Sequence, residues 1–144
     1  MLTAASVLAC ALSVLGRTEA SMPRIELIDV APPGVSAGAE AFVLRDTNTI
    51  YVITSSPVFQ QARQVTHQCG YSDAVRKLAS ILAHEEWHVR HGPDEKSAYE
   101  RQLFTLHRLG VGPGTVMYRN VQTAMITVLD ARKREKPDRV LASR

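Results

Sequence analysis

The sequence is poor in cysteine and in long apolar runs. Its 144 residues include only two cysteines, Cys10 and Cys69, and these lack a Cys-x-x-Cys spacing. That excludes a thiolate metal site and a disulfide framework, whereas whether the two cysteines meet depends on the compartment. The apolar run at residues 4–15 is too short to cross a bilayer as a helix. Internal repeats and low-complexity segments are absent as well, which excludes a repeat array.

Net charge is also small, and it is unevenly distributed. The formal charge is +3, and apolar and charged residues make up 45% and 22% of the chain, fractions typical of a soluble globular protein of one domain. Basic residues gather toward the C-terminus: Arg132, Lys133, Arg134, Lys136, Arg139 and Arg144. We interpret residues 137–144 as a solvated basic tail and expect no nucleic-acid partner, with contact to nucleic acid or anionic lipid as the alternative.

The N-terminal segment, residues 1–20, has two interpretations. Its apolar run has the length of a signal peptide, and residues 18–20 could serve as a small-x-small cleavage site. However, no Lys or Arg precedes the run, and Arg17 and Glu19 lie where cleavage would occur. The alternative is an amphipathic first helix over residues 4–16, ended by a glycine. We favour the helix, and with it the cytoplasm, while a secreted or periplasmic location stays open.

One predicted helix carries the residues with the clearest chemistry. Residues 73–90 predict a helix that begins after an N-cap at Ser72 and is ended by a Gly-Pro pair. His84 and His88 are four residues apart in it, so they share a face and can direct two imidazoles at one ion. Glu85 lies about 100° around the helix from His84, where it can reach a water on that ion without being a ligand.

This His-Glu-x-x-His pattern resembles the active-site helix of zinc metallopeptidases, the zincins. The resemblance implies that His84 and His88 bind zinc and that Glu85 is the general base in hydrolysis of a peptide bond. In zincins the sheet edge nearest the metal holds the substrate as an added strand. Residues 49–54 are the candidate for that edge, with an ordinary inner strand as the alternative.

A catalytic zinc needs a third protein ligand and one open position. The sequence offers five candidates: Asp94, Glu95, Glu100, His91 and His107. His91 shares the face of the two motif histidines, but its ring lies about 4.5 Å beyond that of His88, too far to join the same ion. Glu95 is better placed, because it falls in the first turn of the next helix, just after the chain reverses.

The stretch from Glu95 to Ala98 resembles the Glu-x-x-Ala element of gluzincins, whose third zinc ligand is a glutamate on the helix after the motif helix. The resemblance implies that Glu95 is the ligand and that Ala98 allows the two helices to approach closely. It covers residues 78–102, and the spacer from His88 to Glu95 is shorter than in well-known gluzincins. Glu100, roughly 140° around the helix from Glu95, is the alternative ligand.

Other side chains near the motif have simpler interpretations. Tyr99, one turn after Glu95, is either a hydrogen-bond donor to a developing oxyanion or, as we prefer, a packed tyrosine with its hydroxyl at the surface. We expect Trp87 to anchor the motif helix in the core and Glu86 to be solvated. The isolated histidines His67 and His107 are expected to be structural or surface residues.

The whole pattern predicts an α+β fold. Strands are expected at residues 25–30, 41–45 and 49–54, with a hairpin turn at 46–48. Further helices are expected at residues 58–66, 94–109 and 115–133. We therefore expect a small, mostly antiparallel sheet packed on a helical bundle that carries the motif helix, in one zincin-like domain over residues 21–136.

Two functions of different classes are consistent with the sequence. The first is a zinc-dependent metallopeptidase acting on a peptide or protein substrate. The second is a non-catalytic zinc-binding domain, or a protein-interaction domain derived from a protease. The presence of Glu85, which metal binding alone does not require, favours the enzyme. The sequence predicts no membrane span and fixes neither a cleavage preference nor an oligomeric state.

Overall fold

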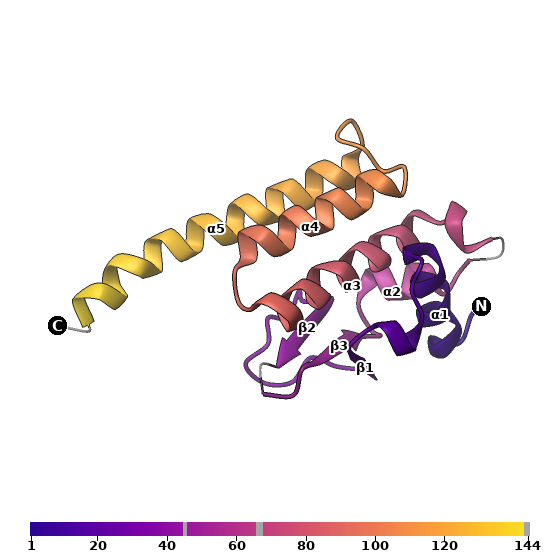
Figure 1. Cartoon of the computed structure of the whole chain (residues 1–144), viewed down its shortest axis with the longest axis horizontal. Coiled ribbons are helices and arrows are strands. Elements are labelled where there is room, and N and C mark those ends of the chain that lie inside the picture. The colour runs from indigo at the N-terminus through magenta and orange to yellow at the C-terminus, as the bar shows by residue number, and fades with distance from the viewer. Residues whose placement is uncertain (45, 66–67, 143–144) are drawn as a thin grey trace.

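The computed structural model describes residues 1–44, 46–65 and 68–142, with side chains described as far as residue 134. Within these residues the fold is α+β, as predicted, with a three-stranded sheet and five α-helices (Figure 1). The strands are β1 (Arg24–Ile28), β2 (Ala41–Leu44) and β3 (Thr49–Ile53). The helices are α1 (Ala4–Leu15), α2 (Pro57–Ala62), α3 (Asp73–His91), α4 (Glu95–Arg108) and α5 (Val116–Ala142), with short 3-10 helices η1 (Glu19–Ser21) and η2 (Cys69–Tyr71).

The sheet is mixed, which corrects the prediction that it would be mostly antiparallel. Strands β2 and β3 form the expected hairpin, and Asn48 in its turn adopts a φ of 50°. Strand β1, however, runs parallel to β3, with Ile25 beside Ile50. The strand order β1-β3-β2 places β3 in the centre. Of the two interpretations of residues 49–54, the inner strand is therefore confirmed and the substrate edge is not, and the edge strand that contacts α3 is β2.

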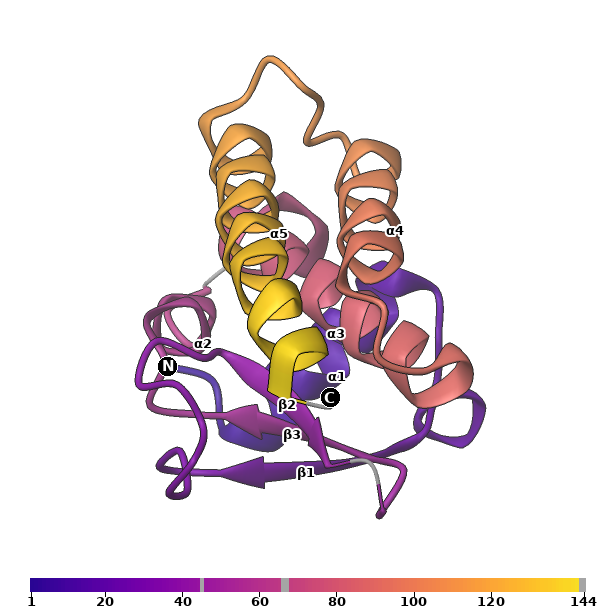
Figure 2. The same cartoon turned by 90° about the vertical axis from the view of Figure 1, so that its left-hand side faces the viewer.

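Helix α3 is the element on which the others pack. It contacts α1, α2 and α4 and also the strands β2 and β3. Figures 1 and 2 show it between the sheet and the α4–α5 pair. The main core joins α1, α2, β3 and α3, and its largest fully buried side chains include Phe59, Ile50, Leu78 and Leu82. This packing fixes the position of α3, the helix that carries the motif residues.

The predicted N-terminal helix is confirmed as α1. It ends at Gly16, whose φ of 74° is a left-handed conformation that glycine adopts without strain. Val7 and Ala11 are fully buried against the main core. Cys10 and Cys69 are joined by a disulfide, which links α1 to η2 just ahead of α3.

The helix boundaries differ from the predictions mainly at two ends. Helix α2 stops at Ala62, earlier than expected, whereas α5 continues past Lys133 to Ala142. The segment interpreted as a solvated tail therefore begins as part of this helix, and residues 143–144 lie outside the described part of the chain. Among the described residues, no helix combines the length and the apolar character needed to cross a membrane.

Candidate metal site

The predicted motif helix is confirmed, with caps that the local sequence explains. The Ser72 hydroxyl accepts a hydrogen bond from the Val75 backbone N–H at 3.2 Å, as expected of an N-cap. Gly92 ends the helix with a φ of 108°. His84 and Glu85 are buried, at 7% and 8% exposure, because α3 is covered along their face. The helix therefore holds both side chains away from bulk water.

Helix α4 begins directly after the chain reversal and places its first residue against α3. The Asp94 side chain caps α4 by accepting from the Lys96 N–H at 3.2 Å. Ala98 is fully buried, and its small side chain suits the close packing of α4 on α3. Because the connection is so short, Glu95 in the first turn of α4 faces the last two turns of α3.

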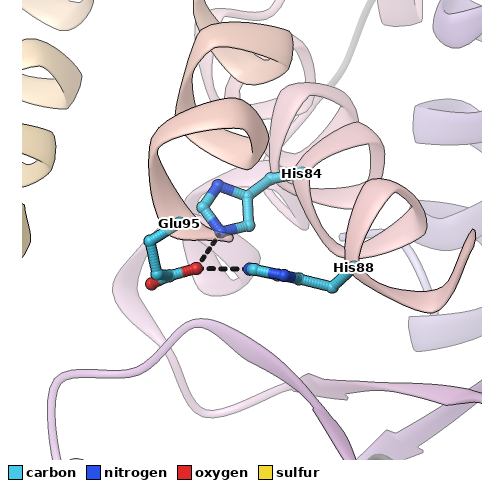
Figure 3. A group of neighbouring side chains, drawn as sticks. All are labelled: His84, His88 and Glu95. Carbon is cyan, nitrogen blue, oxygen red and sulfur yellow. Dashed lines mark hydrogen bonds and ion pairs between the residues drawn. The ribbon is translucent and has the colours of Figure 1, made fainter. Parts of the chain in front are cut away.

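His84, His88 and Glu95 converge as the sequence predicts (Figure 3). The Glu95 Oε1 atom lies 3.4 Å from His84 Nε2 and forms a closer ion pair with His88 Nε2. One ligand atom from each residue lies within 4.8 Å of the other two, so the group could hold a metal ion. The donor set of two imidazoles and a carboxylate fits a divalent metal with an open coordination position.

The other ring nitrogen of each histidine is also occupied. His84 Nδ1 donates to Gln102 Oε1 at 2.9 Å, and Gln102 in turn donates to the Ser80 hydroxyl at 3.4 Å. His88 Nδ1 donates to the Gly92 carbonyl at 2.8 Å. Because these acceptors hold a proton on each Nδ1, each Nε2 is directed at Glu95. That nitrogen donates to the carboxylate when it is protonated and offers its lone pair to a metal when it is not. Gln102 is not among the site residues predicted from the sequence, although its position seven residues after Glu95 places it on the same helix face.

Burial and hydrogen bonding together set the charge of the group. Burial alone would raise the pKa of Glu95, but hydrogen bonds from His84 and His88 hold it well below its usual range. Burial would lower the pKa of His88, whereas its hydrogen bond to Glu95 raises it above the ordinary value. Burial also raises the pKa of Glu85, whose Oε1 atom lies 3.9 Å from His84 Nε2. Glu95 and the two histidines therefore interact strongly before any metal is present.

We call His84, His88 and Glu95 the ligand group. A cavity of about 860 Å³ opens beside it. His84, Glu85, His88 and Glu95 all line it, together with residues of β2, α4 and α5. Tyr99 of α4 is also part of its wall, where the ring packs edge-to-face on His84 with centroids 4.5 Å apart.

The Tyr99 hydroxyl keeps its proton at neutral pH. Burial, and then the carboxylates of Glu95 and Glu85, raise the pKa of Tyr99 to about 12. Of the two interpretations of this residue, the packed ring is confirmed, but the side chain borders the cavity rather than the outer surface. Tyr99 is thus a residue of the cavity wall whose hydroxyl is protonated at neutral pH.

The remaining candidate ligands do not join the group. The cluster contains none of the other four, all of which are exposed: Asp94, Glu100, His91 and His107. His67 lies outside the described residues. The prediction that Trp87 anchors α3 in the core is wrong, because its ring is only partly buried and stacks on exposed His91 with centroids 4.9 Å apart.

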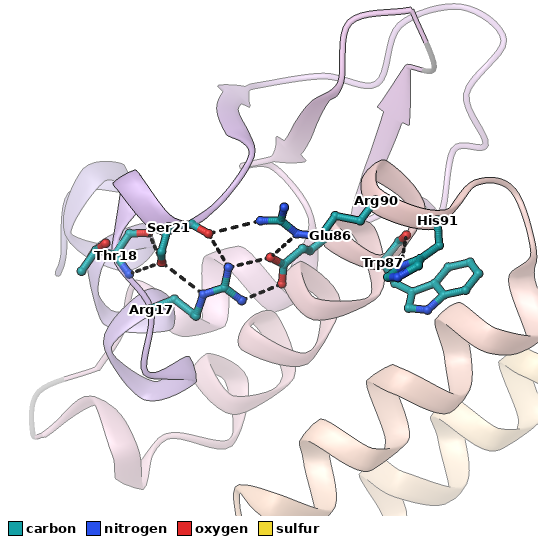
Figure 4. Close-up of polar contacts among 7 residues, drawn as sticks. All are labelled: Arg17, Thr18, Ser21, Glu86, Trp87, Arg90 and His91. Carbon is teal, nitrogen blue, oxygen red and sulfur yellow. Dashed lines mark hydrogen bonds and ion pairs between the residues drawn. The ribbon is translucent and has the colours of Figure 1, made fainter.

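Glu86 is ion-paired and not solvated, contrary to the prediction. Its side chain is 13% exposed and accepts hydrogen bonds from Arg17 at 2.8 and 2.6 Å and from Arg90 at 2.9 Å (Figure 4). Burial alone would raise the pKa of Glu86, but these two guanidinium groups lower it below the ordinary value. Both arginines also donate to the Ser21 carbonyl. The network joins the segment after α1 to the motif helix.

No protein-family model, curated protein or solved structure matches this chain.

Proposed function

We propose that this protein is a zinc-dependent peptidase. The observation that carries the proposal is the convergence of His84, His88 and Glu95 on one point, with the carboxylate of Glu85 beside them in a cavity. Three protein ligands with an open position beside a carboxylate are the arrangement that hydrolytic zinc sites use. Zinc bound there would polarise a substrate carbonyl and lower the pKa of a water toward neutrality.

The role of general base falls to Glu85. It lies next to His84 but outside the three-ligand group, so its oxygens remain available for a proton. Burial raises the pKa of Glu85, which makes its carboxylate a better acceptor near neutral pH. Glu85 would take a proton from the attacking water and deliver it to the leaving amine. The same side chain would therefore accept and donate this proton.

The free edge of β2 supports an extended peptide as the substrate. The Ile53 N–H donates to the Glu40 carbonyl at 3.0 Å, so these two residues form a hydrogen-bonded pair of the ladder. Because such pairs alternate in an antiparallel ladder, Ala41 and Val43 direct their N–H and C=O groups away from β3. Both residues line the cavity. A peptide added as a strand there would lie alongside the ligand group.

Metal content and hydrolysis test the proposal together. Elemental analysis of the zinc-supplied protein should find about one zinc per chain, lost in His84→Ala and Glu95→Ala and kept in the matched control Glu100→Ala. A peptide library analysed by mass spectrometry should show cleavage by the parent protein. Glu85→Gln should keep zinc but lose roughly 10²- to 10⁴-fold in rate, because it removes only the base.

Two results would contradict the proposal. If Glu85→Gln cleaves peptides as fast as the parent protein, the mechanism is wrong. If zinc binds at the three residues and no peptide in the library is cleaved, the non-catalytic zinc-binding domain replaces the enzyme.

A further inference from the structure

The wall of the cavity opposite β2 is formed by α5. Figure 2 shows α5 above the edge of the sheet that β2 forms. Five residues of α5 line the cavity, and they recur on one face of the helix: Asn120, Val121, Ala124, Val128 and Arg132. A peptide lying along β2 would therefore present alternate side chains toward this helix face.

The spacing of the last three residues matches an extended chain. Ala124, Val128 and Arg132 are four residues apart, which corresponds to about 6 Å of rise per step along a helix. Side chains on one face of a strand repeat about every 6.6–6.8 Å, since each residue adds 3.3–3.4 Å. Successive side chains of a bound strand could thus meet successive residues of α5.

The three positions differ in chemistry. Ala124 is exposed and Val128 only half-buried, so both offer apolar surface to the cavity that no described side chain fully covers. Arg132 lines the cavity from α5 and makes no ion pair with any described side chain. Lys77, which also lines the cavity, is paired with Glu40 at 3.1 Å. Among the side chains that the structure describes as far as residue 134, Arg132 is therefore the arginine or lysine in the cavity lining that can pair with an incoming carboxylate.

We propose that the cavity selects an extended peptide in which an apolar side chain lies against Val128 and an acidic side chain two residues away pairs with Arg132. The proposal rests on the proposed function for the choice of a peptide along β2. It adds the sequence pattern, apolar-x-acidic, and assigns the selection to α5, an element outside the ligand group.

Peptide binding, measured without turnover, tests this pattern. The Glu85→Gln protein is titrated, with and without zinc, into fluorescein-labelled peptides that contain Leu-Gly-Glu, Leu-Gly-Lys or the reversed orders, and anisotropy is recorded. In one of the two orders, the Glu peptide should bind about three- to tenfold more tightly than the Lys peptide, as expected for a partly exposed ion pair. The order that shows the preference gives the chain direction.

Charge reversal identifies the residue responsible. Arg132→Glu should invert the preference so that the Lys peptide binds more tightly, whereas Arg134→Glu, which changes net charge equally and does not line the cavity, should leave it unchanged. Val128→Phe, which fills the apolar part, should weaken the Leu peptides, whereas Thr127→Phe, outside the cavity lining, should not.

Equal binding of the Glu and Lys peptides, or equal effects of Arg132→Glu and Arg134→Glu, would overturn the proposal. These readouts are separate from catalysis. Selective binding with no hydrolysis by the parent protein would refute the peptidase and leave the inference standing. Hydrolysis of peptides without regard to the apolar-x-acidic pattern would support the peptidase and refute the inference about α5.

Discussion

Each histidine of the ligand group uses one ring nitrogen to hold the other in place. His84 is fixed by Gln102, and His88 by the Gly92 carbonyl at the end of its own helix. The glycine thus has two functions, because it ends α3 and also orients one of the three side chains that could hold a metal ion. Such outer partners set both the ring direction and the basicity of a metal ligand. The geometry of the site therefore extends one layer beyond the three ligands.

Tyr99 gives a prediction at the same scale. Tyr99→Phe keeps the ring that packs on His84 and removes only the hydroxyl at the cavity. If that hydroxyl stabilises the oxyanion of the transition state, kcat should fall by about tenfold to a hundredfold while KM changes little. Steady-state kinetics on a cleaved peptide measure this. An unchanged kcat would assign Tyr99 a packing role alone.

The four central site residues could be predicted because they are close in the sequence. Helix periodicity places His84, Glu85 and His88 correctly, and one short reversal then brings Glu95 to them. The surroundings of Trp87 and Glu86 could not be predicted this way, since periodicity does not reveal which helix face is left uncovered or which distant residues approach it. Trp87 faces away from the core, and the partner of Glu86 is 69 residues away in the chain.

At the scale of elements, α3 is tied to the N-terminal segment at two places. The Cys10–Cys69 disulfide joins α1 to the short helix that precedes α3. The Arg17–Glu86 pair joins the end of α1 to the motif itself (Figure 4). Between these ties the apolar face of α1 packs on α3. Helix α1 thus supports the motif helix along its buried side.

We predict that Arg17→Met lowers the free energy of unfolding by about 1–2 kcal/mol, because it leaves a largely buried Glu86 with one partner fewer. Urea titration of both proteins measures the difference. Arg24→Met removes the exposed Arg24–Glu26 pair and is the matched control, with an expected effect of about 0.5 kcal/mol or less. Equal effects of the two substitutions would show that burial of the Glu86 pair contributes nothing.

Predictability also differs among the elements. The β2–β3 hairpin and the ends of α3 follow from local turn and cap residues, and both are confirmed. The parallel pairing of β1 with β3 does not follow from any turn, because the two strands are separated by β2 and the loop before it. For that reason the sequence could not decide between an edge strand and an inner strand for residues 49–54, and the structure shows the inner strand.

For the whole molecule, the ligand group predicts a pH dependence of stability. In the metal-free protein the pKa of Glu95 is lowered, so this residue stabilises the fold at pH values above its ordinary pKa of 4.5. That contribution is lost as the pH falls toward the lowered pKa. The pKa of His88 is raised, so this residue stabilises the fold at pH values below its ordinary pKa of 6.5. That contribution is lost as the pH rises through the raised pKa. The pair therefore contributes fully between these two values.

Urea unfolding of the metal-free protein at about pH 5.5 and about pH 8.5 measures the effect. The free energy of unfolding should fall between the two conditions by more in the parent protein than in Glu95→Gln, which lacks the charged partner. A pH dependence that is identical in the two proteins would mean that the His88–Glu95 pair does not contribute.

The short connection between α3 and α4 has a consequence for how the protein acquires its parts during folding. Only seven residues separate His88 from Glu95, so the loop that closes the ligand group costs little entropy. The β2 wall of the cavity, by contrast, comes from much earlier in the chain and packs on α3 through contacts of higher contact order. The ligand group can thus assemble before this wall does. A nascent chain would thus be able to bind a metal ion at these three residues before it forms the β2 edge along which we propose that a peptide binds.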